Sequence, residues 1–544
     1  MSHDQLTGRV GIRALALALS AVCSLAANAA LREPLKLDSG QIGGSVESAP
    51  GIRAFKGIPF AAPPVGALRW TAPQPVAKWS GVRDASKYGN VCIQPPGPSS
   101  GPQARLNIAN MDGSPPTSED CLYLNVWTGA ASANEKRPVM IWWFGGAFTE
   151  GGGSVPLYDG TALAKKGVVV VTMNYRLGAF GFFTHPALTA ESPHKASGNY
   201  GLMDMLASAR WVKNNIAAFG GDPNNVTVFG QSAGAMAIAS LVASPESKGL
   251  FKRAISESGA WMGLGMAPGM TTRAQAEERG VKAATDAGVS TAAELRAMSA
   301  ADVTAKLRSG GCPGCMIVDG WVIPEDPSAT FAAGRQNAVD VLVGSNKEEL
   351  SFGRGATAQQ FEAGARMRWG DLADEFLKLY PHATDEDAAR SNIASTADGT
   401  FWHMRLYADY QVKKGNKAYL YFFAQHPPAP DGKPPFPAAH AAEVPYVFDN
   451  LGQQHLFPDS STPELSAKSA PDKKVADEMS SYWANFAKSG DPNGPGLPKW
   501  SAHAVGRGQD AVILDADPAS EKLPTPERLA LIDKLWMKQG HVLP

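Results

Sequence analysis

Residues 226–236 decide the fold, and they read Val226-Thr227-Val228-Phe229-Gly230-Gln231-Ser232-Ala233-Gly234-Ala235-Met236. A β-branched and aromatic run, typical of a buried strand, meets a Gly-x-Ser-x-Gly turn, and residues that favour a helix follow it. Such a turn places a serine on a sharp strand-to-helix elbow, with its hydroxyl exposed at the carboxyl end of a sheet. We expect a Cβ atom at Gly230 or Gly234 to crowd the neighbouring strand or helix. The stretch predicts that Ser232 is a nucleophile and that the protein is a hydrolase.

The pattern alone is weak evidence, because a chain with 56 glycines among 544 residues can contain one Gly-x-Ser-x-Gly by chance. The surrounding sequence strengthens it by alternating between apolar strands and helical segments. Near-continuous apolar runs, typical of parallel strands buried on both faces, occupy residues 139–143, 168–172, 339–343 and 418–423. This alternation predicts an α/β fold with a doubly wound, mostly parallel sheet. We expect hairpins within residues 36–60, and helix-rich insertions over the site within residues 270–310 and 355–415.

Composition and charge indicate an ordinary globular protein. Hydrophobic residues make up 44% of the chain, charged residues make up 19%, and the net charge is −1. This balance offers no basic surface for nucleic acid or for an anionic membrane, so neither is expected as a partner.

The first 29 residues resemble a secretory signal peptide. Arg9 and Arg13 precede the apolar segment 14–25, and Ala27-Asn28-Ala29 offers small residues for cleavage. No later stretch is apolar for long enough to cross a bilayer, so no transmembrane anchor is expected after cleavage. We therefore expect an exported protein, periplasmic or secreted, whose residues 30–544 form a single domain.

Four cysteines remain after the signal segment, and an even number in an exported chain suggests disulfides. A bond between Cys92 and Cys121 would close a surface loop rich in Pro, Ser and Gly. Cys312 and Cys315 bracket Pro-Gly, and a local disulfide is favoured there. A thioredoxin-like redox pair lacks its flanking βαβ pattern, and a zinc site lacks a second ligand pair.

A serine nucleophile needs a base, and the base needs an orienting acid. On this fold the three residues occur along the chain in the order Ser, acid, His. Glu349 follows the apolar strand at 339–343 and is the candidate acid, with its neighbour Glu348 as competitor. Adjacent side chains after a strand point in different directions, so one of the two should face the site. His440 lies in a later loop of small residues that would let its ring reach across.

Acyl transfer also needs hydrogen-bond donors for the developing oxyanion. The segment Phe144-Gly145-Gly146-Ala147-Phe148 follows a buried strand, and its glycines leave backbone N–H groups open to a substrate oxygen. Together with the N–H group of Ala233, this segment predicts an oxyanion hole with three donors.

The chain resembles the type-B carboxylesterase family, relatives of acetylcholinesterase, in a secreted bacterial form. The motifs that carry the resemblance span most of the chain and include Glu119-Asp120-Cys121-Leu122-Tyr123-Leu124-Asn125-Val126, residues 144–148, Asn174-Tyr175-Arg176-Leu177-Gly178, Gly198-Asn199-Tyr200-Gly201-Leu202-Met203-Asp204, Phe219-Gly220-Gly221-Asp222-Pro223 and the Ser232 elbow.

The resemblance implies the α/β-hydrolase fold and hydrolysis of a small-molecule carboxylic ester without metal or cofactor. By motif, the family's site residues fall on Ser232 as nucleophile, Glu349 as acid, His440 as base, Gly146, Ala147 and Ala233 as oxyanion donors, and Ser258 as buttress of the acid. Its early disulfide falls on Cys92 and Cys121, and Trp261 is expected to contribute to the acyl pocket.

The chain departs from the family pattern at three places. Gln231 replaces the usual Glu before the nucleophile, and Asn110 and Met111 stand where a Trp would bind a quaternary ammonium group. Both changes favour neutral or anionic esters over choline esters. Phe144 replaces a frequent His, but the backbone donors of the oxyanion hole do not need that side chain.

Two other classes of function are alternatives to ester hydrolysis. An acyltransferase or amidase could employ the same triad, and the sequence does not exclude either one. A non-catalytic adhesion or binding protein of this family would have lost the nucleophile, whereas Ser232, Glu349 and His440 are all present. The oligomeric state does not follow from the sequence.

Overall fold

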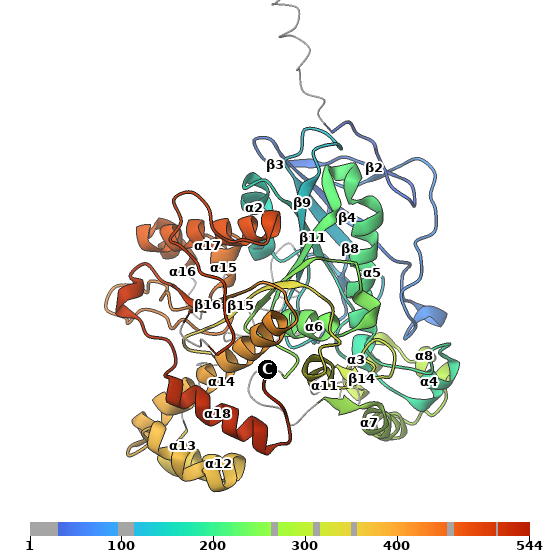
Figure 1. The fold of residues 1–544 in the computed structure, drawn as a ribbon. Coiled ribbons are helices and arrows are strands. Elements are labelled where there is room, and N and C mark those ends of the chain that lie inside the picture. Colours follow the sequence, from blue (N-terminus) through green and yellow to red (C-terminus); the bar gives the residue numbers. More distant parts are fainter. Residues whose placement is uncertain are drawn as a thin grey trace, which may run out of the picture.

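The computed structural model describes residues 31–95, 114–262, 270–307, 316–349, 356–453, 462–506 and 510–544. Within these residues the main element is a ten-stranded sheet in the order β17-β16-β15-β12-β11-β9-β10-β8-β4-β3. Figure 1 labels β3, β4, β8, β9, β11, β15 and β16 of this sheet. Its strands are β3 (Val46–Ala49), β4 (Ile52–Pro59), β8 (Tyr123–Thr128), β9 (Arg137–Trp143), β10 (Val169–Met173), β11 (Gly221–Gln231), β12 (Arg253–Glu257), β15 (Asp340–Asn346), β16 (Ala418–Phe423) and β17 (Val512–Leu514).

Neighbouring strands from β17 to β10 are parallel, whereas β8, β4 and β3 pair antiparallel at the other end. The mostly parallel sheet predicted from the apolar runs is therefore confirmed. Every residue of the parallel strands β10 and β16 is buried. Burial on both faces explains why their sequences are continuously apolar rather than alternating.

The predicted hairpins lie at the start of the chain. β3 pairs antiparallel with β4, and β1 (Leu35–Lys36) pairs antiparallel with β2 (Gln41–Gly43). The small sheets in the described residues are completed by β5 (Val82–Asp84), β6 (Val91–Cys92), β7 (Thr117–Ser118), β13 (Thr271–Thr272) and β14 (Ile317–Val318).

Strand β11 begins earlier than the apolar pattern suggests. Gly221 already pairs with Arg137, and the register shifts before Val226 pairs with Val139. The polar residues of this irregular section carry no apolar signal, which is why the sequence pattern marks only the second half of the strand.

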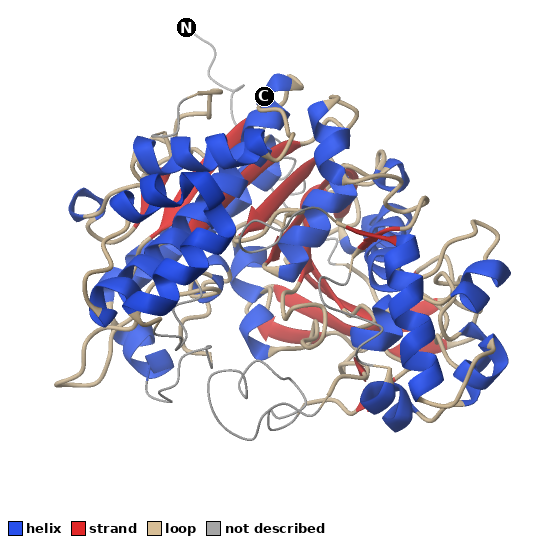
Figure 2. Ribbon diagram, turned by 90° about the horizontal axis from the view of Figure 1, so that it is seen from below, coloured by secondary structure: helices blue, strands red, loops and turns tan. Residues whose placement is uncertain are grey.

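Helices flank the sheet, and Figure 2 shows strands running between them. The helices that accompany the strands are α2 (Thr161–Lys165), α3 (Gly178–Phe182), α4 (Pro186–Glu191), α5 (Tyr200–Asn215), α6 (Ala233–Val242), α11 (Pro327–Ala332), α15 (Val444–Val447), α16 (Thr462–Lys468), α17 (Ala470–Ser489) and α18 (Pro526–Lys538). Helix α6 packs on β11 and β12, and α17 packs on β9 and β11.

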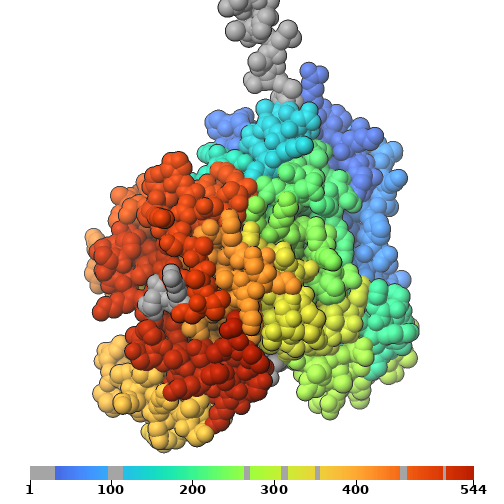
Figure 3. Space-filling view, in the orientation of Figure 1, coloured from blue at the N-terminus to red at the C-terminus, as the bar shows by residue number. Residues whose placement is uncertain are grey.

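The expected insertions are helical. They contain α7 (Arg273–Asp286), α8 (Ala292–Ala297), α9 (Ala300–Lys306), α12 (Ala358–Trp369), α13 (Ala373–Leu379) and α14 (Asp385–Lys413). Helix α14 packs on β15 and β16, while α13 contacts the C-terminal α18. In Figure 3 the golden segment at the lower left, which contains α12 and α13, lies at the molecular surface and adjoins the red C-terminal part.

Candidate functional site

Ser232 lies between the end of β11 and the start of α6, so it forms the predicted elbow. Its backbone has φ 54° and ψ −120°, and its N–H group donates to the carbonyl of Glu257 at 2.8 Å. A non-glycine residue with positive φ is strained and persists only where the surrounding structure holds it. The residue is 9% exposed.

The two glycines of the elbow are required by close packing. A Cβ atom on Gly230 would lie 2.4 Å from the carbonyl oxygen of Trp143, and one on Gly234 would lie 1.8 Å from the same atom. Trp143 ends β9, the strand beside β11. The expected crowding at both glycines is therefore confirmed.

Glu349 and His440 meet although they are 91 residues apart, with the Glu349 Oε2 atom 2.6 Å from Nδ1 of His440. The Glu349 side chain is fully buried, and its Oε1 accepts a hydrogen bond from the backbone N–H of Asn346 at 3.0 Å. Burial alone would lower the pKa of His440, but the charge of Glu349 and its hydrogen bond outweigh burial and raise that pKa.

Glu348, the competing acid, does not contact His440. Its Oε2 lies 2.9 Å from Nε2 of His426 and accepts a hydrogen bond from the backbone N–H of Ala438 at 2.6 Å. The structure thus brings Glu349 rather than Glu348 to the imidazole.

Gln231 reaches the other side of the imidazole ring. Its amide nitrogen lies 3.2 Å from His440 Nε2. Since an amide NH₂ group only donates, Nε2 accepts, and the ring proton lies on Nδ1 toward Glu349. Among the described residues, no hydrogen bond joins Ser232 Oγ to His440. The Gln231 amide instead occupies Nε2, the imidazole nitrogen that would accept the proton of a serine nucleophile.

The predicted oxyanion segment lies against the elbow. A Cβ atom on Gly145 would lie 3.0 Å from the Cβ of Ser232, so only glycine permits this approach. Gly146 and Ala147 both have positive φ, 106° and 52°. Ala233 is the first residue of α6, where N–H groups lack intrahelical acceptors.

Phe144, which stands at the position of the frequent family histidine, packs into the core. Its ring stacks on Tyr175 with centroids 4.3 Å apart, and the Tyr175 hydroxyl donates to the Phe144 carbonyl at 2.9 Å. The chain following β9 is thereby held by an aromatic contact and a hydrogen bond.

Two supporting residues predicted from sequence lie near the end of β12. Ser258 is buried, and its hydroxyl has no hydrogen-bond partner in the part of the chain that the structure describes. Trp261 stacks on Phe331 at 4.2 Å and donates its indole N–H to Ser328 at 2.8 Å.

Two polar residues near Glu349 and His440 were not predicted from the sequence. The Asn346 side chain donates to the carbonyl of Ala439 at 2.6 Å and to Glu443 at 2.5 Å. Burial is the main cause that raises the pKa of Glu443 to about 7, and the nearby charge of Glu349 adds to it. The sequence feature that could have identified Glu443 is a carboxylate inside the otherwise apolar segment 441–447.

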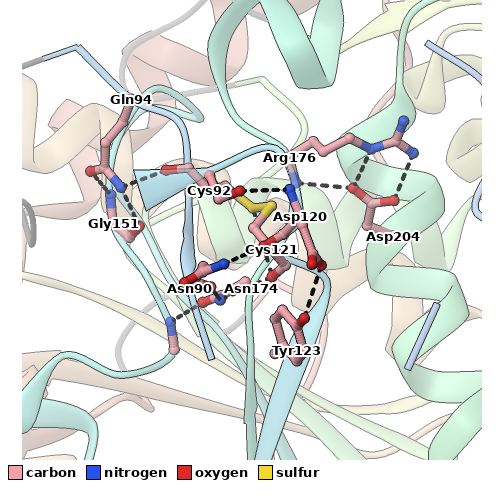
Figure 4. The surroundings of a disulfide bond; sticks show 12 residues. Asn90, Cys92, Gln94, Asp120, Cys121, Tyr123, Gly151, Asn174, Arg176 and Asp204 are labelled. Atoms are coloured by element: carbon pink, nitrogen blue, oxygen red, sulfur yellow. Dashed lines mark hydrogen bonds and ion pairs between the residues drawn. A yellow bond between two sulfur atoms is a disulfide. The ribbon is translucent and has the colours of Figure 1, made fainter. Parts of the chain in front are cut away.

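The disulfide predicted between Cys92 and Cys121 is confirmed (Figure 4). The neighbouring Gln94 exchanges two hydrogen bonds of 3.0 Å with the main chain of Gly151. Asn174 donates to the carbonyl of Cys121 at 3.1 Å. Gln94, two residues after Cys92, therefore ties this region to the segment that follows the predicted oxyanion residues.

Several predicted features lie outside the described residues. These are the signal segment 1–29, Asn110 and Met111, and the pair Cys312 and Cys315. Within the described residues, no helix is long and apolar enough to cross a membrane.

Comparison with known proteins identifies relatives along most of the chain. Residues 32–524 match the carboxylesterase family. The chain is 39% identical to a fumonisin B1 esterase of Sphingopyxis macrogoltabida, covering 83% of this chain and 81% of the relative. It is 36% identical to a para-nitrobenzyl esterase of Bacillus subtilis (strain 168), covering 92% and 98%.

Solved structures give the same result. A PNB esterase superposes with a TM-score of 0.73 at 34% identity, covering 90% of this chain and 99% of that one. A carboxylesterase of Geobacillus stearothermophilus superposes with a TM-score of 0.72 at 33% identity, covering 89% and 96%.

Proposed function

Because the chain belongs to the carboxylesterase family and is a carboxylic-ester hydrolase, we propose that Ser232, His440 and Glu349 carry out the reaction through an acyl-enzyme. The observation that carries this proposal is the contact of 2.6 Å between Glu349 and His440, in a protein whose Ser232 lies on a strained strand-to-helix elbow.

In the first half-reaction, Ser232 Oγ attacks the ester carbonyl carbon while His440 Nε2 takes the hydroxyl proton. The resulting tetrahedral intermediate collapses, the bond to the alcohol oxygen breaks, and His440 returns the proton to that oxygen. Glu349 keeps the Nδ1 proton in place and stabilises the imidazolium that forms. Water then attacks the acyl-enzyme with the same base, and Ser232 is regenerated.

The backbone N–H groups of Gly146, Ala147 and Ala233 are proposed to donate to the oxyanion. Gly145 supports this assignment, because its lack of a side chain lets the segment approach Ser232. Loss of one such donor typically costs ~3–4 kcal/mol of transition-state stabilisation.

The Gln231 amide must move away from Nε2 of His440 before this nitrogen can accept the proton of Ser232. We propose that substrate entry accompanies this exchange, since both groups compete for one imidazole nitrogen. An uncharged amide beside the nucleophile also supports a preference for neutral or anionic esters over cationic ones.

The decisive experiment compares wild type with Ser232→Ala on p-nitrophenyl esters of increasing acyl length. We expect Ser232→Ala to lose activity by at least ~10⁴-fold, as in other serine triads. Ser240→Ala is the matched control, because Ser240 is a buried serine of α6, the helix that follows Ser232, and its replacement should leave turnover unchanged. Residual activity near the wild-type value in Ser232→Ala would refute the mechanism.

Substrate class is tested with the same enzyme by titrating the carboxylic acid that each ester releases. A p-nitrobenzyl ester and fumonisin B1 are informative substrates, because two relatives are named for them. We expect a choline ester to have a kcat/KM well below that of a neutral ester with the same acyl group.

We further propose that the protein is exported and that residues 30–544 are one domain. The Cys92–Cys121 disulfide supports export, because such bonds persist in oxidising compartments. Mass spectrometry of the mature N-terminus tests the proposed cleavage near residue 29, and an intact N-terminus would contradict it.

A further inference from the structure

Glu348 holds the loop that carries His440. Its backbone N–H donates to the carbonyl of Ala438 at 3.0 Å, and its Oε2 accepts from the Ala438 N–H at 2.6 Å. An isolated parallel bridge also joins Glu348 to Ala439. Glu348 therefore fixes the main chain two residues before the imidazole.

His426 ties the other end of this loop to the same carboxylate. It lies three residues after β16, and its Nε2 is 2.9 Å from Glu348 Oε2. One carboxylate oxygen thus joins the beginning and the end of the segment 426–438. The segment links the last residues of a buried strand to the residue proposed as the base.

Three residues at the end of β15 and just after it contact the loop at different points. The Asn346 side chain binds the Ala439 carbonyl, Glu348 binds Ala438, and Glu349 binds His440. The two adjacent carboxylates therefore hold the same loop at different points, one through the main chain and one through the imidazole.

The charges around His426 favour an ion pair between its imidazolium and the carboxylate of Glu348. Lys347 and Glu521 also face this histidine, and they pair with each other at 2.6 Å. The hydrogen bond to Glu348 raises the pKa of His426 despite burial. Burial alone would raise the pKa of Glu348, but the hydrogen bond and charge of His426 lower it.

We propose that Glu348 and His426 are positioning residues that hold the 426–438 loop so that His440 stays aligned with Glu349 and the nucleophile. The proposal rests on the proposed function of His440. Neither residue contacts the imidazole, so both act through the backbone of the loop. A misplacement of ~1 Å in a catalytic group can reduce the rate by ~10²-fold.

The test compares Glu348→Ala and His426→Gln with Glu521→Gln as matched control. Glu521 belongs to the same charge group but pairs with Lys347 rather than with the loop. For each variant, kcat and KM are measured with p-nitrophenyl butyrate, and the rate and stoichiometry of Ser232 labelling are measured with a fluorophosphonate. Labelling reports folded, competent protein as well as the reactivity of the nucleophile.

We expect Glu348→Ala to lower kcat by ~10- to 100-fold, with KM within about twofold of wild type, because the chemical step depends on base alignment. Labelling should be slower but stoichiometric. His426→Gln keeps a donor for Glu348 but loses the charge, so it should show a smaller decrease in kcat. Glu521→Gln should behave as wild type.

Unchanged kcat and labelling rate in Glu348→Ala would overturn the proposal. If that variant labels incompletely because it misfolds, His426→Gln decides, and an unchanged kcat there overturns the proposal. A loss of ~10⁴-fold in Glu348→Gln, with little change in Glu349→Gln, would instead make Glu348 the acid and refute the proposed triad. Activity retained in Ser232→Ala would refute the proposed function independently of the loop.

Discussion

Replacing Gln231 by glutamate would place a negative charge beside the proposed base. In the structure, the amide nitrogen of Gln231 lies 3.2 Å from Nε2 of His440. A carboxylate oxygen at this distance attracts an imidazolium by ~1.3 kcal/mol in bulk water and by ~5 kcal/mol at an effective dielectric constant of 20. Because the introduced carboxylate also loses hydration in this covered site, we expect a net gain of ~1.4–2.7 kcal/mol for the imidazolium.

This gain corresponds to a rise of ~1–2 units in the pKa of His440. His440 acts as a base only when it is neutral, so the acidic limb of kcat/KM against pH should move upward by the same amount. In the wild type this limb should already lie above pH 6.5, since the Glu349 charge and hydrogen bond raise the pKa of His440 against the effect of burial.

The assay is the pH dependence of kcat/KM for a neutral p-nitrophenyl ester, which reports titration of the free enzyme. Gln231→Met is the matched control, because it has similar size but no charge. Its acidic limb should move upward by ~0.4–1 unit, the effect of losing one neutral hydrogen bond to the imidazole, and by less than that of Gln231→Glu. At pH 7 Gln231→Glu should be slower than wild type, by up to ~10-fold for a rise of one unit and up to ~100-fold for a rise of two, and should recover as the pH rises. An acidic limb that coincides in wild type and Gln231→Glu would refute the argument that Gln231 lies against the catalytic base.

Three further predictions concern folding and stability. Gly234→Ala should abolish the yield of active soluble protein, because the added Cβ would lie 1.8 Å from the carbonyl oxygen of Trp143; wild-type specific activity in a purified sample would contradict this. The double variant Cys92→Ser/Cys121→Ser should lose ~3–4 kcal/mol of unfolding free energy in urea, since the bond spans 29 residues and restricts the unfolded chain; a loss below ~1 kcal/mol would show that this restriction matters little. For buried His503, two carboxylate hydrogen bonds outweigh burial and raise the pKa from 6.5 to about 9, so its stabilisation is complete below pH 6.5 and disappears as the pH rises through 9. The unfolding free energy of wild type should therefore fall over this window in urea titrations, and His503→Gln should show a flatter dependence; equal slopes would exclude His503 as the cause.

Local patterns were sufficient to predict the strands that carry the site. Continuous apolar runs identified β9, β10, β15 and β16, and the Gly-x-Ser-x-Gly turn identified the elbow, because both depend on neighbouring residues. The steric need for Gly234 was also predictable, although the atom it avoids, the carbonyl oxygen of Trp143, belongs to another strand.

Contacts between distant segments required the tertiary structure. The strand pattern left Glu348 as a competitor of Glu349, since adjacent side chains offer the same chemistry, and only the family resemblance favoured Glu349. Sheet register and the path of the loop after β16 bring Glu349 to His440 and Glu348 to His426. No periodicity along the chain encodes that difference.

The sequence by itself therefore determined the elbow of Ser232, the parallel sheet and the identities of the residues available for catalysis, because these follow from local backbone and burial preferences. The tertiary structure showed that Glu349 rather than Glu348 contacts His440, and it alone placed the Gln231 amide beside Nε2 of His440, 209 residues away in the chain. The physical reason is that hydrogen bonds act over about 3 Å in space, whatever the separation of their partners in sequence.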